Sequence, residues 1–158
     1  MEKATLAIGC FWCAEAAFKL KKGVVSVTPG YAGKEHVETV QIEYDLKLTS
    51  FQELLEIFWE IHNPTEKNKQ GPDVGPEYQA VIFYHTKEKQ KIAEQTKEKQ
   101  SLKYKEPIAT EILPFEDFHE AQEHHKNFYE KNPSTVYSQT IIAPKIEKVK
   151  KLLQKDEE

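Results

Sequence analysis

Both cysteines of the chain lie near its start, three positions apart, in residues 9–15 (GCFWCAE). The apolar run before them, residues 4–8, is typical of a strand, so we expect Cys10 to stand where a strand gives way to a helix. Unpaired N–H groups and the helix dipole should lower the pKa of Cys10 below that of a free thiol. Cys13 follows one helical turn later on the same side. One sulfur can therefore attack an electrophile, and the other can then close a disulfide.

Glu15 follows Phe11 by four positions and Trp12 by three, so its carboxyl can lie against both aromatic rings. Partial desolvation would raise the pKa of this carboxyl, and a carboxylic acid kept protonated near neutrality could donate to a substrate oxygen. The alternative is an ordinary first-turn acid that complements the helix dipole. Phe11 and Trp12 are compatible both with a binding pocket and with core packing.

Four more side chains are candidates for a site. Tyr31 in a glycine-rich turn and Tyr78 at the start of a buried strand carry hydroxyl donors on loops, although tyrosines also cap sheet edges. Asp73, within the sequence GPDVG, is explained as simply by a turn in which it bonds its own backbone. His125 shares an apolar helical stripe with Phe118 and fits a core histidine better than a catalytic base.

The cysteines could also bind a metal ion together with His119 and His124. The gap of roughly a hundred residues far exceeds the short ligand spacing of compact zinc modules, and the chain has no second CxxC pair. We therefore expect neither a metal ion nor another cofactor.

The composition limits the function classes. A chain of 158 residues with 39% hydrophobic and 30% charged residues fits one domain over residues 1–158. Its formal charge of -4 argues against a nucleic-acid partner. All 22 basic residues are lysine, so no guanidinium group can clamp a carboxylate or phosphate. With no signal peptide and no run near the ~18 apolar residues of a membrane span, we expect a cytoplasmic protein without a membrane partner.

Hydrophobic periodicity predicts an α+β fold of the split βαβ (ferredoxin-like) type, a two-layer sandwich with a mostly antiparallel sheet and added helices. A turn is expected at residues 29–33 and a long polar loop at residues 65–77. The expected strands are residues 4–9, 24–28, 39–44, 80–83 and 108–113. The expected helices are residues 11–22, 51–63, 86–103, 116–131 and an amphipathic tail around residues 146–153.

Four motifs in order resemble the peptide methionine sulfoxide reductase A family, over roughly residues 4–128. They are GCFW at residues 9–12 followed by Glu15, PGYAG at 29–33, FWEIHNPT at 58–65, and QGPDVG at 70–75 before Tyr78. The resemblance implies a thiol-dependent enzyme that reduces methionine S-sulfoxide, free or in proteins, to methionine. A cysteine sulfenic acid and a Cys10–Cys13 disulfide would be its intermediates, and a thioredoxin-like reductant would recycle it.

The resemblance also implies a role for each site residue. Cys10 would be the nucleophile, and Phe11 and Trp12 would form the pocket for the substrate methyl group. The groups on the sulfoxide oxygen would be Glu15, Tyr31 and Tyr78, with Asp73 in the supporting polar network.

Some positions depart from the family pattern. Cys13 replaces the usual glycine and the C-terminal region lacks a cysteine, as in the smaller CFWC subgroup, so the disulfide must form locally. Other departures, which concern peptide preference, are Lys34, Glu77, Gln79, Gln122 and His124. We expect a monomer. A general dithiol-disulfide oxidoreductase that uses CxxC alone and a metal-stabilised binding module remain the alternatives.

Overall fold

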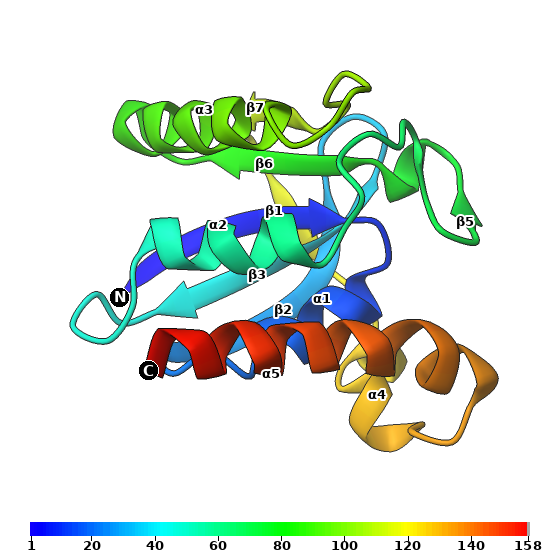
Figure 1. The fold of residues 1–158 in the computed structure, drawn as a ribbon. Helices are drawn as coiled ribbons and strands as arrows, with labels where there is room; N and C mark the ends of the chain where they lie inside the picture. The colour runs from blue at the N-terminus through cyan, green and yellow to red at the C-terminus, as the bar shows by residue number, and fades with distance from the viewer. Residues whose placement is uncertain (158) are drawn as a thin grey trace.

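A six-stranded sheet in the order β7-β6-β1-β3-β2-β8 forms the centre of the computed structural model, which describes residues 1–157 (Figure 1). All neighbouring strands are antiparallel except the β6–β7 pair. The strands are β1 (Glu2–Ile8), β2 (Val24–Ala32), β3 (Val37–Tyr44), β6 (Ala80–Tyr84), β7 (Glu111–Pro114) and β8 (Phe118–Glu120).

The chain order β1-α1-β2-β3-α2-β6, with these four strands side by side as β6-β1-β3-β2, confirms the predicted split βαβ arrangement. Helices α1 (Phe11–Phe18) and α2 (Phe51–Glu60) cover one face of the sheet together with α5 (Ala143–Glu157), as Figure 1 shows. Helix α3 (Lys87–Ser101) packs beside α2 and β6. In the described part of the chain, no helix is both long and apolar enough to cross a membrane.

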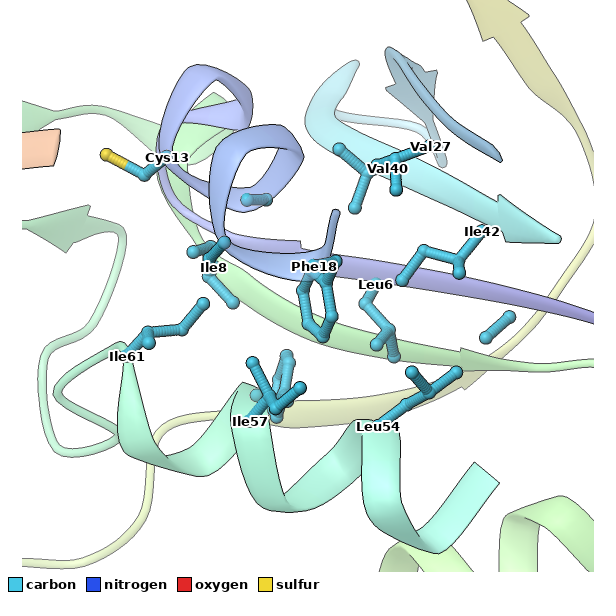
Figure 2. Close-up of a cluster of buried hydrophobic side chains, with 14 of the residues drawn as sticks. Leu6, Ile8, Cys13, Phe18, Val27, Val40, Ile42, Leu54, Ile57 and Ile61 are labelled. Carbon is cyan, nitrogen blue, oxygen red and sulfur yellow. The ribbon is translucent and has the colours of Figure 1, made fainter. Parts of the chain in front are cut away.

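The main core lies between this face of the sheet and the helices. Figure 2 shows Leu6 of β1 and Ile42 of β3 facing Leu54 of α2, with Phe18 of α1 beside Leu6. Each side chain of this kind contributes about 1.5–3 kcal/mol when it is fully buried. Helix α2 is capped at its N-terminus, because the Glu53 backbone N–H donates to the Ser50 hydroxyl. The sandwich therefore fixes the end of β1, where α1 begins.

Several expected boundaries were wrong. Strand β2 continues through the expected turn to Ala32, because Tyr31 pairs with Glu38 of β3. The polar segment 65–77 contains a small hairpin of β4 (Lys69–Gln70) and β5 (Asp73–Val74), followed by the 3-10 turn η1 (Pro76–Tyr78). Helix α1 ends at Phe18, four residues earlier than expected. Tyr31 consequently stands on a rigid strand and not on a loop.

The expected helix over residues 116–131 is also wrong. Its first part is β8, which pairs with β2, and the rest forms the 3-10 turn η2 (Glu123–His125) and the short helix α4 (Phe128–Lys131). Asn127 between them has a φ of 56°, in the left-handed region, which breaks the helix. Residues 118–120, which belong to an apolar pattern typical of a helix, thus pair as a strand with the exposed edge of β2. The tail helix is confirmed as α5, which follows a π-helical segment, η3 (Ser138–Ile142).

Candidate active site

Cys10 stands at the predicted junction as the N-cap residue of α1, separated from the end of β1 by Gly9 alone. Gly9 has a φ of 108°, and a Cβ at this position would lie 2.6 Å from the Cβ of Gln70, so only glycine fits the junction. Cys10 is 5% exposed and Cys13 is fully buried. Both are free thiols. The two sulfur atoms therefore lie together under the protein surface.

A hydrogen bond links the two thiols and sets their pKa values in opposite directions. Burial raises the pKa of Cys10 well above its usual value, and the bond to Cys13 and the charge of Glu38 raise it further. The same bond is the main cause of a lowered pKa at Cys13, with Lys145 as a further cause. The expected low pKa of Cys10 is thus wrong for the resting site, because desolvation outweighs the helix dipole. Of the two thiols, Cys10 is therefore the one that burial keeps protonated, and Cys13 is the more readily ionised.

Glu38 is a site residue that the motifs did not identify. The Phe11 backbone N–H at the start of α1 donates to its Oε1 across 3.2 Å. Burial, together with the charges of Asp73 and Glu77, raises the pKa of Glu38 to about 7. The charge of Glu38 in turn raises the pKa of Cys10 and of Tyr31, so this carboxyl group lies near both.

A signal for Glu38 exists in the sequence. Glu38 shares one face of β3 with Val40, Ile42 and Tyr44, and all three of these face the main core. An acidic residue on the strand face that points into the core is unusual, because a charged group is costly to bury without a partner.

Tyr31, Asp73 and Tyr78 all interact with the carboxyl group of Glu38. Burial raises the pKa of Tyr78 to about 12, with further contributions from Glu38, Asp73 and Cys10, and it also raises that of Tyr31. Both hydroxyl groups therefore remain protonated donors near neutral pH. Tyr31 on β2 contacts the ring of Phe11, the residue next to Cys10, at 5.5 Å. The charge of Asp73 on β5 affects the pKa of Cys13, and Cys10 affects that of Tyr78 at the end of η1.

Aromatic rings form a wall beside the thiols. The Phe11 ring meets the Tyr31 ring edge-on at 5.5 Å, and the Trp12 ring stacks on Phe128 with a centroid distance of 3.7 Å. The Trp12 indole N–H donates to Nδ1 of His125 across 3.2 Å. Burial lowers the pKa of His125, which favours the neutral ring that can accept this bond. His125 therefore orients Trp12 and is not part of the core stripe that its spacing suggested.

Tyr137 is a second residue that the sequence did not reveal. Its ring meets Trp12 edge-on at 5.6 Å, and its hydroxyl donates to Oδ2 of Asp73 across 2.6 Å. The Tyr137 hydroxyl also lowers the pKa of both Cys10 and Cys13. Tyr137 lies far from the other motifs in sequence, and no pattern marks it.

The hydrogen-bond partners of Glu15 lie at the start of α4 and not among the polar groups around Glu38. Glu15 is 3% exposed, and its Oε1 accepts a hydrogen bond from the Asn127 backbone N–H across 2.8 Å. Burial raises its pKa, as expected, while Lys19 and the backbone N–H groups of Asn127 and Phe128 act in the opposite direction. Glu15 thus faces α4, and its partners differ from those of Glu38.

The metal-site alternative finds no geometric support. His119 is exposed on β8 and lies 3.3 Å from the Asp117 carboxylate, while the His124 ring packs against His125 at 4.0 Å. Within residues 1–157, no three His, Cys, Asp or Glu side chains are grouped so that they could hold a metal ion.

Comparisons with known proteins identify one family. A family model described as peptide methionine sulfoxide reductase matches residues 2–157. The peptide methionine sulfoxide reductase MsrA of Sulfolobus acidocaldarius is 45% identical, over 96% of this chain and 94% of the relative. That of Thermus thermophilus is 42% identical, over 95% and 94%.

Solved structures show the same fold. Reduced Mxr1 from Saccharomyces cerevisiae superposes with a TM-score of 0.81 at 30% identity, covering 85% of this chain and 87% of Mxr1. Mxr1 in complex with Trx2 superposes with a TM-score of 0.64 at 28% identity, covering 80% and 84%.

Proposed function

The chain belongs to the peptide methionine sulfoxide reductase A family, and from this premise we propose that it reduces methionine S-sulfoxide to methionine with Cys10 as nucleophile and Cys13 as resolving thiol. The observation that carries the proposal is the position of Glu38. Its carboxyl group, with a pKa of about 7, stands at the start of α1 and interacts with Cys10, Tyr31 and Tyr78.

The acid in this proposal is Glu38 and not Glu15. A sulfoxide sulfur is a poor electrophile until its oxygen is protonated or hydrogen-bonded. A carboxyl group with a pKa near 7 is well suited to give that proton at neutral pH. The hydroxyl groups of Tyr31 and Tyr78 supply further hydrogen bonds to the oxygen. The rings of Phe11, Trp12 and Tyr137 are the proposed apolar contacts of the substrate methyl group.

The thiol pair supplies the nucleophile. The proton of the Cys10 thiol passes along its hydrogen bond to Cys13, and the Cys10 sulfur attacks the sulfoxide sulfur. Glu38 protonates the oxygen, which is transferred to Cys10. The sulfoxide becomes the thioether, and Cys10 becomes a sulfenic acid. Two electrons pass from Cys10 to the substrate, and no other reductant is needed in this step.

Cys13 then resolves the sulfenic acid. The Cys13 sulfur attacks the Cys10 sulfur, an S–S bond forms, and the hydroxyl group leaves as water with the proton of the Cys13 thiol. An external dithiol must reduce this disulfide. A thioredoxin-like protein is the proposed donor. The support is the structural similarity of this chain to Mxr1, which has been solved in complex with Trx2.

Two assays separate this function from the general dithiol-disulfide oxidoreductase. With dithiothreitol as donor, the protein should convert methionine S-sulfoxide to methionine, and Glu38→Gln should impair this reaction. Reduction of insulin disulfides should be slow and should not depend on Glu38. Rapid insulin reduction without methionine formation would instead favour the alternative.

A further inference from the structure

Glu15 is a buried carboxylate that the proposed chemistry does not use. It is 3% exposed, although it borders a cavity of about 390 Å³ between α1, α4 and α5. Burying a carboxylate is costly unless hydrogen bonds or an opposite charge compensate for the lost hydration. Its surroundings therefore indicate what it does.

All of the favourable partners of Glu15 lie on its own helix or at the start of α4. The backbone N–H groups of Asn127 and Phe128 stabilise its charged form, the first across 2.8 Å. Lys19, one turn later on α1, lies 3.8 Å from Oε2 of Glu15 and also donates to the side chain of Asn127. Glu15 and Lys19 thus hold the left-handed turn at Asn127 from which α4 begins.

That turn determines where Phe128 stands. Phe128 is the first residue of α4, and its ring lies nearly parallel to the Trp12 ring, with an angle of 6° and a centroid distance of 3.7 Å. On the other side of the turn, His125 accepts the hydrogen bond from the Trp12 indole. Two of the rings that contact Trp12, those of Phe128 and His125, are therefore carried by the segment that Glu15 holds.

We propose that Glu15 is a positioning residue: its carboxylate anchors the turn at Asn127, so that Phe128 and His125 hold the Trp12 ring in the wall of the site. This inference rests on the proposed function only where it assigns Trp12 to the substrate pocket. A group held about 1 Å out of place can lower the rate by about 10²-fold. A residue that touches no reacting atom can therefore matter for catalysis.

The proposal predicts opposite outcomes for two substitutions of Glu15. Glutamine keeps an oxygen that accepts from Asn127, so E15Q should remain within about threefold of the native kcat/KM, as expected when a charge-assisted hydrogen bond becomes a neutral one. Alanine removes the anchor, and E15A should lose about 10-fold or more in kcat/KM, mainly through KM, because the pocket wall loosens. If Glu15 were the proton donor, E15Q would be as inactive as E15A.

Trp12 itself can report the anchor independently of activity. The other tryptophan, Trp59, can be replaced in a W59F background so that only Trp12 emits. In this background, E15A should shift the emission to longer wavelength and increase acrylamide quenching, while E15Q should not. E15D, which withdraws the carboxylate by one methylene group, should give an intermediate shift and serves if E15A does not fold. E147A, at an exposed carboxylate on the same cavity, is the matched control.

A double-mutant cycle of E15A with F128L tests whether Glu15 acts on Trp12 through Phe128. If Glu15 acts through Phe128, the losses in kcat/KM and the emission shifts of E15A and F128L should not add in the double variant. Additive effects, an unchanged Trp12 emission in E15A, or loss of activity in E15Q equal to that in E15A would each overturn the proposal. If the native chain reduces no sulfoxide, the proposed function fails, but the emission series still decides whether Glu15 positions Trp12.

Discussion

The Tyr137 hydroxyl donates a hydrogen bond to Asp73 across 2.6 Å, and this bond joins the C-terminal segment to the loop that carries Tyr78. The same hydroxyl interacts with both cysteine sulfurs. Segment η3 and helix α5, which follow Tyr137, pack on α1. The C-terminal segment therefore covers the thiol pair and also sets its electrostatics.

Replacing Tyr137 with phenylalanine tests this relationship. Y137F keeps the ring beside Trp12 but removes the hydroxyl that lowers the pKa of both thiols, so their titration should move to higher pH. The ultraviolet absorbance of the thiolate, followed across pH, measures this shift. Y104F, at a tyrosine that follows α3, should leave the titration unchanged. A midpoint that stays the same or moves to lower pH in Y137F would contradict the assignment.

Glu38 should determine the pH dependence of the chemical step. A general acid must be protonated, so the single-turnover rate should fall as the pH rises through about 7, the pKa of Glu38. E38Q cannot give a proton and should be slower by about 10²-fold or more. Its pH profile should be flat over this range. Rapid-quench measurement of methionine formation gives both results, and E43Q, farther along β3, is the control. A near-native rate in E38Q would remove Glu38 from the mechanism.

The raised pKa of Glu38 also predicts a pH dependence of stability. The pKa of Glu38 rises from 4.5 to about 7 on folding, so the folded chain binds this proton more tightly than the unfolded chain. The resulting stability is fully present below pH 4.5 and is lost as the pH rises through about 7. Urea unfolding should show the free energy of the native protein falling relative to that of E38Q over this window. A constant difference would mean that Glu38 is not buried as described.

The sequence predicted those parts of the site that lie close to a motif. Cys10, Cys13, Phe11 and Trp12 share one segment, and the central split βαβ order follows from clear hydrophobic periodicity. Glu38 could not be placed in the same way, because it reaches Phe11 through the pairing of β1 with β3. A local pattern does not specify such a contact.

The C-terminal third was harder to predict for a related reason. Phe118 belongs to an apolar pattern that fits a helix, but the free edge of β2 takes it into β8. Phe128 and Tyr137 follow β8 in the chain, so their contacts with Trp12 could not be foreseen from a helix over residues 116–131. For the same reason, the hydrogen bond between Glu15 and the turn at Asn127 could not be foreseen from the sequence.

The two cysteines should have separable roles. C10S should form no methionine, because the nucleophile is absent. C13S should form about one methionine per enzyme and then stop, with Cys10 left as a sulfenic acid that a dimedone probe can trap. This single turnover should be slower than in the native protein, because C13S also lacks the acceptor for the Cys10 proton. Product counting by chromatography and mass analysis of the protein test both outcomes. Sustained turnover by C10S, or an equal burst in both variants, would reverse or remove the assignment.

The most direct test uses the two sulfoxide epimers separately, without added reductant. One equivalent of methionine S-sulfoxide should yield methionine and leave a Cys10–Cys13 disulfide, seen as the loss of two hydrogens in the mass of the intact protein. The R epimer should leave the protein unchanged, because one enzyme serves one epimer. Equal reaction with both epimers, or methionine formation with both thiols still free, would contradict the account.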